Sequence, residues 1–187
     1  PALPVTVAGV AFNVPPAAVR VPMQRQPGAH ERIDLGFLWP SLQPPEAAPL
    51  PNVPTKGMPK AKPFDRVFVT IAAARDSLPP EERVKTIYSR YAESEASAGP
   101  EGLAVVAFRQ GTPYQGEDLI YDAAAPQNFL VRCSRNGAGP TPGMCLYVRR
   151  IGEADVTVRF LRDWLNDWRP VAGNIERLMT KLRPPGA

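Results

Sequence analysis

Alternating apolar and polar residues predict β-strands along much of the chain. Strands are expected at 5–12, 33–39, 66–72, 102–109, 117–121 and 155–160. Two more, 129–133 and 145–149, flank a Gly/Pro-rich stretch in mirrored order, which is typical of a β-hairpin. Short turns between neighbouring strands favour antiparallel pairing. We therefore expect one or more sheets that are mainly antiparallel.

Apolar residues recur instead at three- and four-residue spacing in two stretches, which predicts helices. The first covers residues 80–97, where Glu81 and Glu82 lie in the first turn and oppose the helix dipole favourably. The second runs from Phe160 to Leu182, and Pro170 is expected to break or kink it. The predicted fold class is α+β, with one mid-chain helix and a C-terminal helix packed on a sheet face.

Proline divides the chain into predicted units. There are 24 prolines in 187 residues, more than twice the usual share of about 5%. Residues 43–63 hold seven of them and no aromatic residue, so this stretch reads as an extended linker. It separates an N-terminal strand-turn-strand unit at 1–42 from an α+β domain at 64–187.

A weak internal similarity links the two units. Residues 5–9 and 14–16 align without gaps, at an offset of 64, with residues 69–73 and 78–80. Both copies read as a strand followed by Pro-Pro and a helical turn, which predicts a single short turn at 13–19. A duplication relating 1–42 to 64–110 and a chance match in a Pro- and Ala-rich chain both fit this pattern.

The two cysteines, Cys133 and Cys145, end and begin the two hairpin strands. Facing side chains in such a pair have Cβ atoms about 4.5–5.5 Å apart, so a disulfide is predicted. An oxidised pair is typical of exported proteins, and we expect a periplasmic or other extracytoplasmic location. The sequence holds no signal peptide and no apolar run of about 18 residues. A membrane anchor would therefore precede Pro1.

The net charge is +4, and the excess lies in the last third of the chain, where ten basic and five acidic residues follow from Leu130 onward. This asymmetry predicts contact with an anionic surface such as phospholipid headgroups. The candidate contact residues are Arg149, Arg150, Arg159 and Arg162. A solvated, arginine-rich sheet face is the alternative. No helix-turn-helix, zinc-finger or RNP pattern appears, so nucleic acid is not expected as a partner.

Candidate catalytic chemistry is confined to carboxylates. Glu117, Asp118 and Asp122 flank a short strand and could cleave a glycosidic bond if two of them lay about 5–9 Å apart across a cleft. Solvated acidic residues at a turn are the alternative. The chain has one histidine, His30, and neither a nucleophile elbow nor a phosphate-binding glycine loop. No metal or cofactor is predicted.

Four segments carry a resemblance to a known group: Ile-Asp-Leu to Trp-Pro at 33–40, Gly-Glu-Asp-Leu-Ile-Tyr at 116–121, the cysteine pair, and Val-Thr-Val-Arg-Phe to Asn-Asp-Trp at 156–168. The chain resembles uncharacterised membrane-anchored envelope proteins of proteobacteria, in which a transmembrane helix precedes such a domain. The resemblance implies no activity. The predicted function is a non-enzymatic binding or scaffold domain of the envelope, whose partner is an envelope protein or an anionic membrane surface. A carboxylate-dependent hydrolase of envelope polysaccharide is the alternative.

Overall fold

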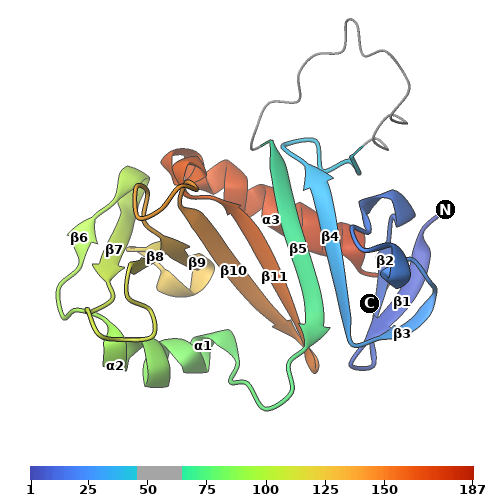
Figure 1. The fold of residues 1–187 in the computed structure, drawn as a ribbon, viewed down its shortest axis with the longest axis horizontal. Helices are drawn as coiled ribbons and strands as arrows, with labels where there is room; N and C mark the ends of the chain where they lie inside the picture. Colours follow the sequence, from blue (N-terminus) through green and yellow to red (C-terminus); the bar gives the residue numbers. More distant parts are fainter. Residues whose placement is uncertain (46–64) are drawn as a thin grey trace, which may run out of the picture.

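The computed structural model describes residues 1–45 and 65–187 and confirms the predicted α+β class (Figure 1). Its main element is an eight-stranded sheet in which all neighbours are antiparallel. In spatial order the strands are β4 (Arg32–Leu38), β5 (Arg66–Ala73), β11 (Ala154–Leu161), β10 (Met144–Ile151), β9 (Leu130–Ser134), β8 (Glu117–Asp122), β7 (Leu103–Ala107) and β6 (Ser97–Ala98). Single 3-10 turns lie at Pro16–Ala18, Pro22–Gln24, Pro100–Gly102 and Pro126–Asn128.

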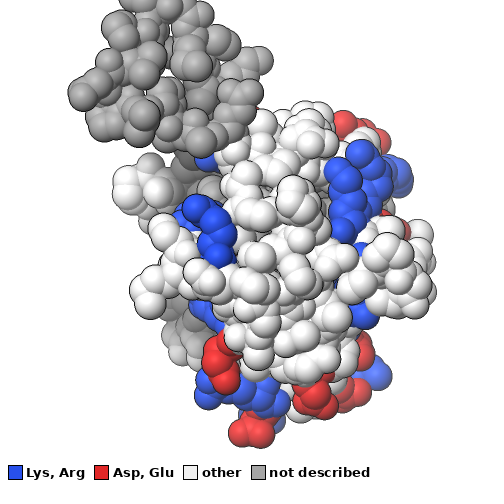
Figure 2. Space-filling view, turned by 90° about the vertical axis from the view of Figure 1, so that its right-hand side faces the viewer, with Lys and Arg blue, Asp and Glu red and all other residues white. Residues whose placement is uncertain are grey.

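A three-stranded sheet forms the N-terminal end, in the order β2 (Val10–Val14), β1 (Leu3–Val7), β3 (Gly28–His30). The single strand predicted for 5–12 is wrong, because the chain reverses at Ala8 and Gly9, which both have positive φ. A two-residue hairpin turn of this kind matches the twist of its strands. Seen from this end, the molecule is mostly uncharged at its centre, with Lys and Arg side chains along the sides (Figure 2).

The C-terminal helix packs on one face of the large sheet, as predicted. A 3-10 segment, η6 (Arg162–Asp167), leads into α3 (Trp168–Leu182), which runs behind β10, β11, β5 and β4 in Figure 1. The helix buries the side chains of Trp168, Val171, Ile175, Leu178, Met179 and Leu182. Pro170 lies in the first turn of α3, where its missing N–H would have no partner anyway. The expected break therefore falls just before Pro170, at Asp167, whose backbone is not helical.

The mid-chain helix is shorter than predicted. It comprises α1 (Pro80–Arg83), a π turn called η3 (Val84–Tyr88) and α2 (Ser89–Tyr91), instead of extending to residue 97. It ends because Ala92 becomes extended and bridges to Phe108 on the neighbouring strand segment. The guanidinium of Arg109 also donates to the carbonyl of Ala92 at 2.9 Å, which satisfies a carbonyl at the helix end.

The two helices cover opposite faces of the sheet. The core against α3 includes Val156, Val158 and Phe160 of β11, each fully buried. A separate and smaller cluster lies against α1, η3 and α2 on the other face, and its buried members are Tyr88, Ala92, Val106, Phe108 and Leu119. On β10, β11, β5 and β4, the face that α3 does not cover is therefore the face on which the mid-chain helix lies.

Strands from both predicted units share the large sheet. β4 lies within 1–42 and pairs with β5, within 64–187, at seven positions. The similar segments 5–9 and 69–73 occupy different sheets: the first enters the β1–β2 turn and the second belongs to β5. The linker predicted for 43–63 lies outside the described residues from residue 46 onward. Among the helices of the described part, none has the length and apolarity needed to cross a bilayer.

Candidate binding groove

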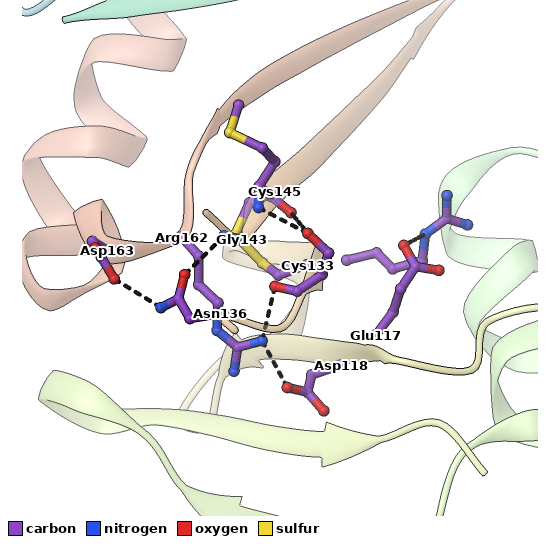
Figure 3. The surroundings of a disulfide bond; sticks show 11 residues. Glu117, Asp118, Cys133, Asn136, Gly143, Cys145, Arg162 and Asp163 are labelled. Carbon is purple, nitrogen blue, oxygen red and sulfur yellow. Dashed lines mark hydrogen bonds and ion pairs between the residues drawn. A yellow bond between two sulfur atoms is a disulfide. The ribbon is translucent and has the colours of Figure 1, made fainter. Parts of the chain in front are cut away.

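The predicted disulfide is present and joins β9 to β10 (Figure 3). Cys133 and Cys145 are directly opposite each other in the sheet, with Cα atoms 4.0 Å apart, and both are fully buried. A buried disulfide of this kind is typical of proteins that fold in an oxidising compartment. It also leaves no free cysteine as a candidate nucleophile among the described residues.

The loop that follows β9 is tied down on both sides (Figure 3). The Asn136 side chain accepts a hydrogen bond from the Gly143 N–H at 2.8 Å and donates one to Asp163 of η6 at 2.9 Å. A Cβ on Gly143 would lie 2.5 Å from the carbonyl oxygen of Ser134, so glycine is required there. These contacts hold the loop at Asn136 and Gly143, next to the disulfide, and we call this region the joint between β9 and β10.

The three candidate catalytic carboxylates do not share a cleft. Glu117 and Asp118 are adjacent on β8, so their side chains point to opposite faces of the sheet. Asp118 is 4% exposed and lies 2.7 Å from Arg162 and 3.1 Å from Arg135. Glu117 pairs with an arginine on the other face, and Asp122 accepts a hydrogen bond from a backbone N–H two residues on. Each carboxylate thus has a structural contact, and this arrangement does not support two-carboxylate catalysis.

The four candidate arginines are likewise divided between the two faces. Arg149 points toward α3 and forms an ion pair with Glu176, which raises the pKa of Arg149 and lowers that of Glu176. Arg150 points the other way and pairs with Asp155 at 2.6 Å, and its pKa is raised by that hydrogen bond. Arg159 is exposed on the same face as Arg150. The fourth, Arg162, forms the ion pair with Asp118 described above. Contact with an anionic surface stays a prediction, and these side chains do not form one patch.

His30 lies in β3, and its Nε2 lies 2.7 Å from the carbonyl oxygen of Gln26. Within the described residues, no group of three or more histidine, cysteine or acidic side chains is arranged to hold a metal ion.

A groove opens where β9 and β10 diverge. The two strands pair at only two positions, Cys133 with Cys145 and Arg132 with Leu146. Beyond Leu146, β10 continues along β11 to Ile151, and no second strand of the described chain flanks it there. A cavity of about 810 Å³ occupies this position. It is lined by five consecutive residues of β10 on one side and by residues of β9, the turn at Pro126–Asn128 and the mid-chain helix on the others.

The groove has an apolar wall and a basic rim. The lining includes the aliphatic residues Val84, Leu130, Leu146 and Val148 and the aromatic residues Tyr88, Phe129 and Tyr147. The charged lining residues are Arg83, Lys85, Arg132, Arg149, Arg150 and Glu81. The Arg132 guanidinium lies over the rings of Tyr88 and Tyr114, at 5.8 and 4.7 Å from their centroids. A concave, largely apolar surface with a few convergent polar groups is the usual form of a binding site.

Sequence reasoning identified two of the groove's arginines, Arg149 and Arg150, and did not identify the groove. The alternation of residues 145–149 indicates a strand, but it carries no signal that the strand loses its neighbour after Leu146. The aromatic and aliphatic lining residues read as ordinary core positions in the sequence, because they belong to the same periodic stripes.

Comparison with known proteins gives a similarity of fold. No family model matches the chain, and no curated protein matches it either. A solved structure, the immunity protein Smlt3025 of the Stenotrophomonas maltophilia type IV secretion system, superposes with a TM-score of 0.60. The match covers 98% of this chain and 93% of that one, at 15% sequence identity. The two proteins therefore share a fold over nearly their whole lengths.

Proposed function

We propose that this chain is an immunity protein, a non-enzymatic protein that binds a secreted protein toxin in the bacterial envelope and blocks it. The observation that carries the proposal is the fold shared with a type IV secretion immunity protein over 98% of the chain. The match also covers 93% of that protein, so it is not limited to a common sheet motif.

Two features of the site support binding rather than catalysis. The candidate carboxylates are held in ion pairs or backbone contacts, whereas the groove offers an apolar wall with a basic rim. The Cys133–Cys145 disulfide supports a periplasmic location, where such a toxin arrives. The resemblance to anchored envelope proteins extends this proposal: a segment N-terminal to Pro1 would hold the domain at the membrane.

A competition assay tests the proposal. The gene is deleted in its own organism, and the mutant is mixed with parental cells whose type IV secretion system is active. We expect the mutant to be killed, and we expect survival when the parent lacks secretion or when the chain is restored with a periplasmic export signal. Equal survival of mutant and parent would contradict the proposal. Full rescue by a copy without an export signal would contradict the periplasmic location.

A further inference from the structure

The backbone of β10 faces the groove beyond the disulfide. At Met144 both backbone groups meet Ser134 of β9: the N–H donates to the Ser134 hydroxyl at 2.9 Å, and the carbonyl lies 3.5 Å from it. In an antiparallel sheet, both backbone groups of one residue point to the same neighbour, and alternate residues point to alternate sides. Val148 and Arg150 therefore direct their N–H and C=O groups to the side where β9 has diverged.

The outer edge of the same sheet is treated differently. Along β4, Leu35 bridges to Val19, and the Arg20 N–H donates to the carbonyl of Asp34 at 2.9 Å. The Gln24 side chain accepts from the Asp34 N–H at 2.7 Å. Natural sheets block exposed edges in this way, because unpaired backbone groups invite pairing with another chain. The open stretch of β10 is thus an edge that the fold leaves available.

We propose that the open edge of β10 is the docking site for an extended, acidic segment of the toxin, which adds a strand to the sheet. This inference rests on the proposed function. An added strand would pair with Val148 and Arg150 through its backbone and would place alternate side chains in the groove. The edge is about as long as an ordinary strand of 5–6 residues.

The charge balance of the groove favours an acidic partner over a basic one. Five basic residues and one acidic residue line the groove, and one of the basic side chains, Arg149, is turned toward α3. When the carboxylates that pair with its arginines, Glu117, Asp155 and Glu176, are included, the site is still net positive. A second copy of this chain fits less well, because edge-to-edge pairing would bring the arginines of one copy next to those of the other.

A defined peptide tests the edge without the toxin. The probe is Thr-Val-Glu-Val-Glu-Val with blocked ends, titrated to about 1 mM, the range of weak binding, while backbone amide signals are followed by NMR. We expect the largest shifts at Val148 and Arg150. The same peptide N-methylated at every residue cannot donate backbone hydrogen bonds, and we expect it to bind about tenfold or more weakly. A version with Lys in place of both Glu should also bind more weakly.

Variants of the protein supply the matched controls. Lys85→Glu reverses an exposed charge in the groove lining and should weaken the peptide several-fold. Arg90→Glu reverses an exposed charge on the same helical segment outside the lining and should leave binding unchanged. Val148→Pro removes one edge N–H at a position where proline is tolerated in strands, and it should abolish binding. If Val148→Pro does not fold, peptide binding to the folded Lys85→Glu variant still tests the proposal.

The proposal is overturned if the peptide causes no shifts at the β10 edge, or if the N-methylated form binds equally well. It is also overturned by a concentration-dependent dimer that Val148→Pro abolishes, since the edge would then bind a second copy. These results are independent of the competition assay: a chain that protects cells but does not bind the peptide refutes edge docking alone. A chain that binds the peptide but does not protect refutes the immunity function.

Discussion

The two halves of the large sheet are built differently. In the half formed by β4, β5, β11 and β10, neighbouring strands pair at seven, six and eight positions, and α3 covers one face. The half formed by β9, β8, β7 and β6 has shorter strands, and the mid-chain helix covers the opposite face. The halves meet at two paired positions and a disulfide.

The difference shows how a sheet can hold an open edge in its middle. A continuous ladder between β9 and β10 would close the groove, because every backbone group of β10 would then have a partner. The disulfide instead fixes the halves at one point, and beyond Leu146 the two strands no longer pair. The proposed binding surface lies at this joint.

The largest expected effects are on stability, and they distinguish the core against α3 from the smaller cluster. Phe160, fully buried in the core against α3, and Phe108, 3% exposed in the smaller cluster, form a matched pair. Phe160→Ala should lower the free energy of unfolding by about 4 kcal/mol, because it leaves a large cavity. Phe108→Ala should cost about 3 kcal/mol, and the faster amide exchange that follows should be confined to β6, β7, β8 and the mid-chain helix. Uniform acceleration of exchange in both variants would show that the halves unfold as one unit.

The second prediction concerns the joint itself. Replacing both Cys133 and Cys145 with Ala should lower the free energy of unfolding by about 3 kcal/mol, because the bond closes a loop of 12 residues in the unfolded chain. Denaturant titration of the oxidised protein and the double variant measures this difference. If the variant were as stable as the parent, the two paired positions between β9 and β10 would hold the halves together without the disulfide. That result would contradict the role given to the disulfide here.

A smaller effect should appear at the blocked edge. The Asp34 carboxylate accepts hydrogen bonds from Arg32, Gln24 and Thr70, and the first of these is the main cause of its lowered pKa. Because the folded pKa lies below the unfolded value of about 3.9, the stabilisation is present above about pH 4 and is lost as the pH falls through the folded pKa. Asp34→Asn should cost about 1 kcal/mol at pH 7, since hydrogen bonds of this kind contribute about that much and Arg32 is largely exposed.

Measuring the free energy of unfolding from pH 7 to pH 2 checks this prediction. The parent and the Asp34→Asn variant should converge at low pH. A constant gap over the whole range would mean that the carboxylate charge does not contribute, and that the substitution acts through packing. Glu31→Gln, at an exposed position directly before β4, is the matched control and should change stability little.

Much of the fold could be predicted from the sequence because it depends on local periodicity. Alternation located β4, β5 and β11, and the mirrored settings of Cys133 and Cys145 predicted the disulfide. The β1–β2 turn was missed because Ala8 and Gly9 lie inside a run of small and apolar residues that reads as one continuous strand. The helix end at Tyr91 was missed because it depends on Arg109, a residue distant in sequence.

The groove could not be predicted, for a related reason. It depends on where β9 stops pairing with β10. The alternation within one segment predicts a strand but does not show how far that strand pairs with another. The candidate carboxylates were chosen for spacing along β8, but adjacent residues on a strand point to opposite faces. Glu117 and Asp118 therefore could not act together once the strand was formed.

Amide hydrogen exchange on the complex between this chain and the toxin that it neutralises tests the central claim most directly. If the toxin adds a strand to β10, the amides of Val148 and Arg150 should become protected by at least about tenfold on binding, because each gains a hydrogen-bond partner. The amides of Asp34 and Leu35 on the blocked edge of β4 should be unchanged. Unchanged exchange at Val148 and Arg150, with new protection elsewhere on the molecule, would contradict the account.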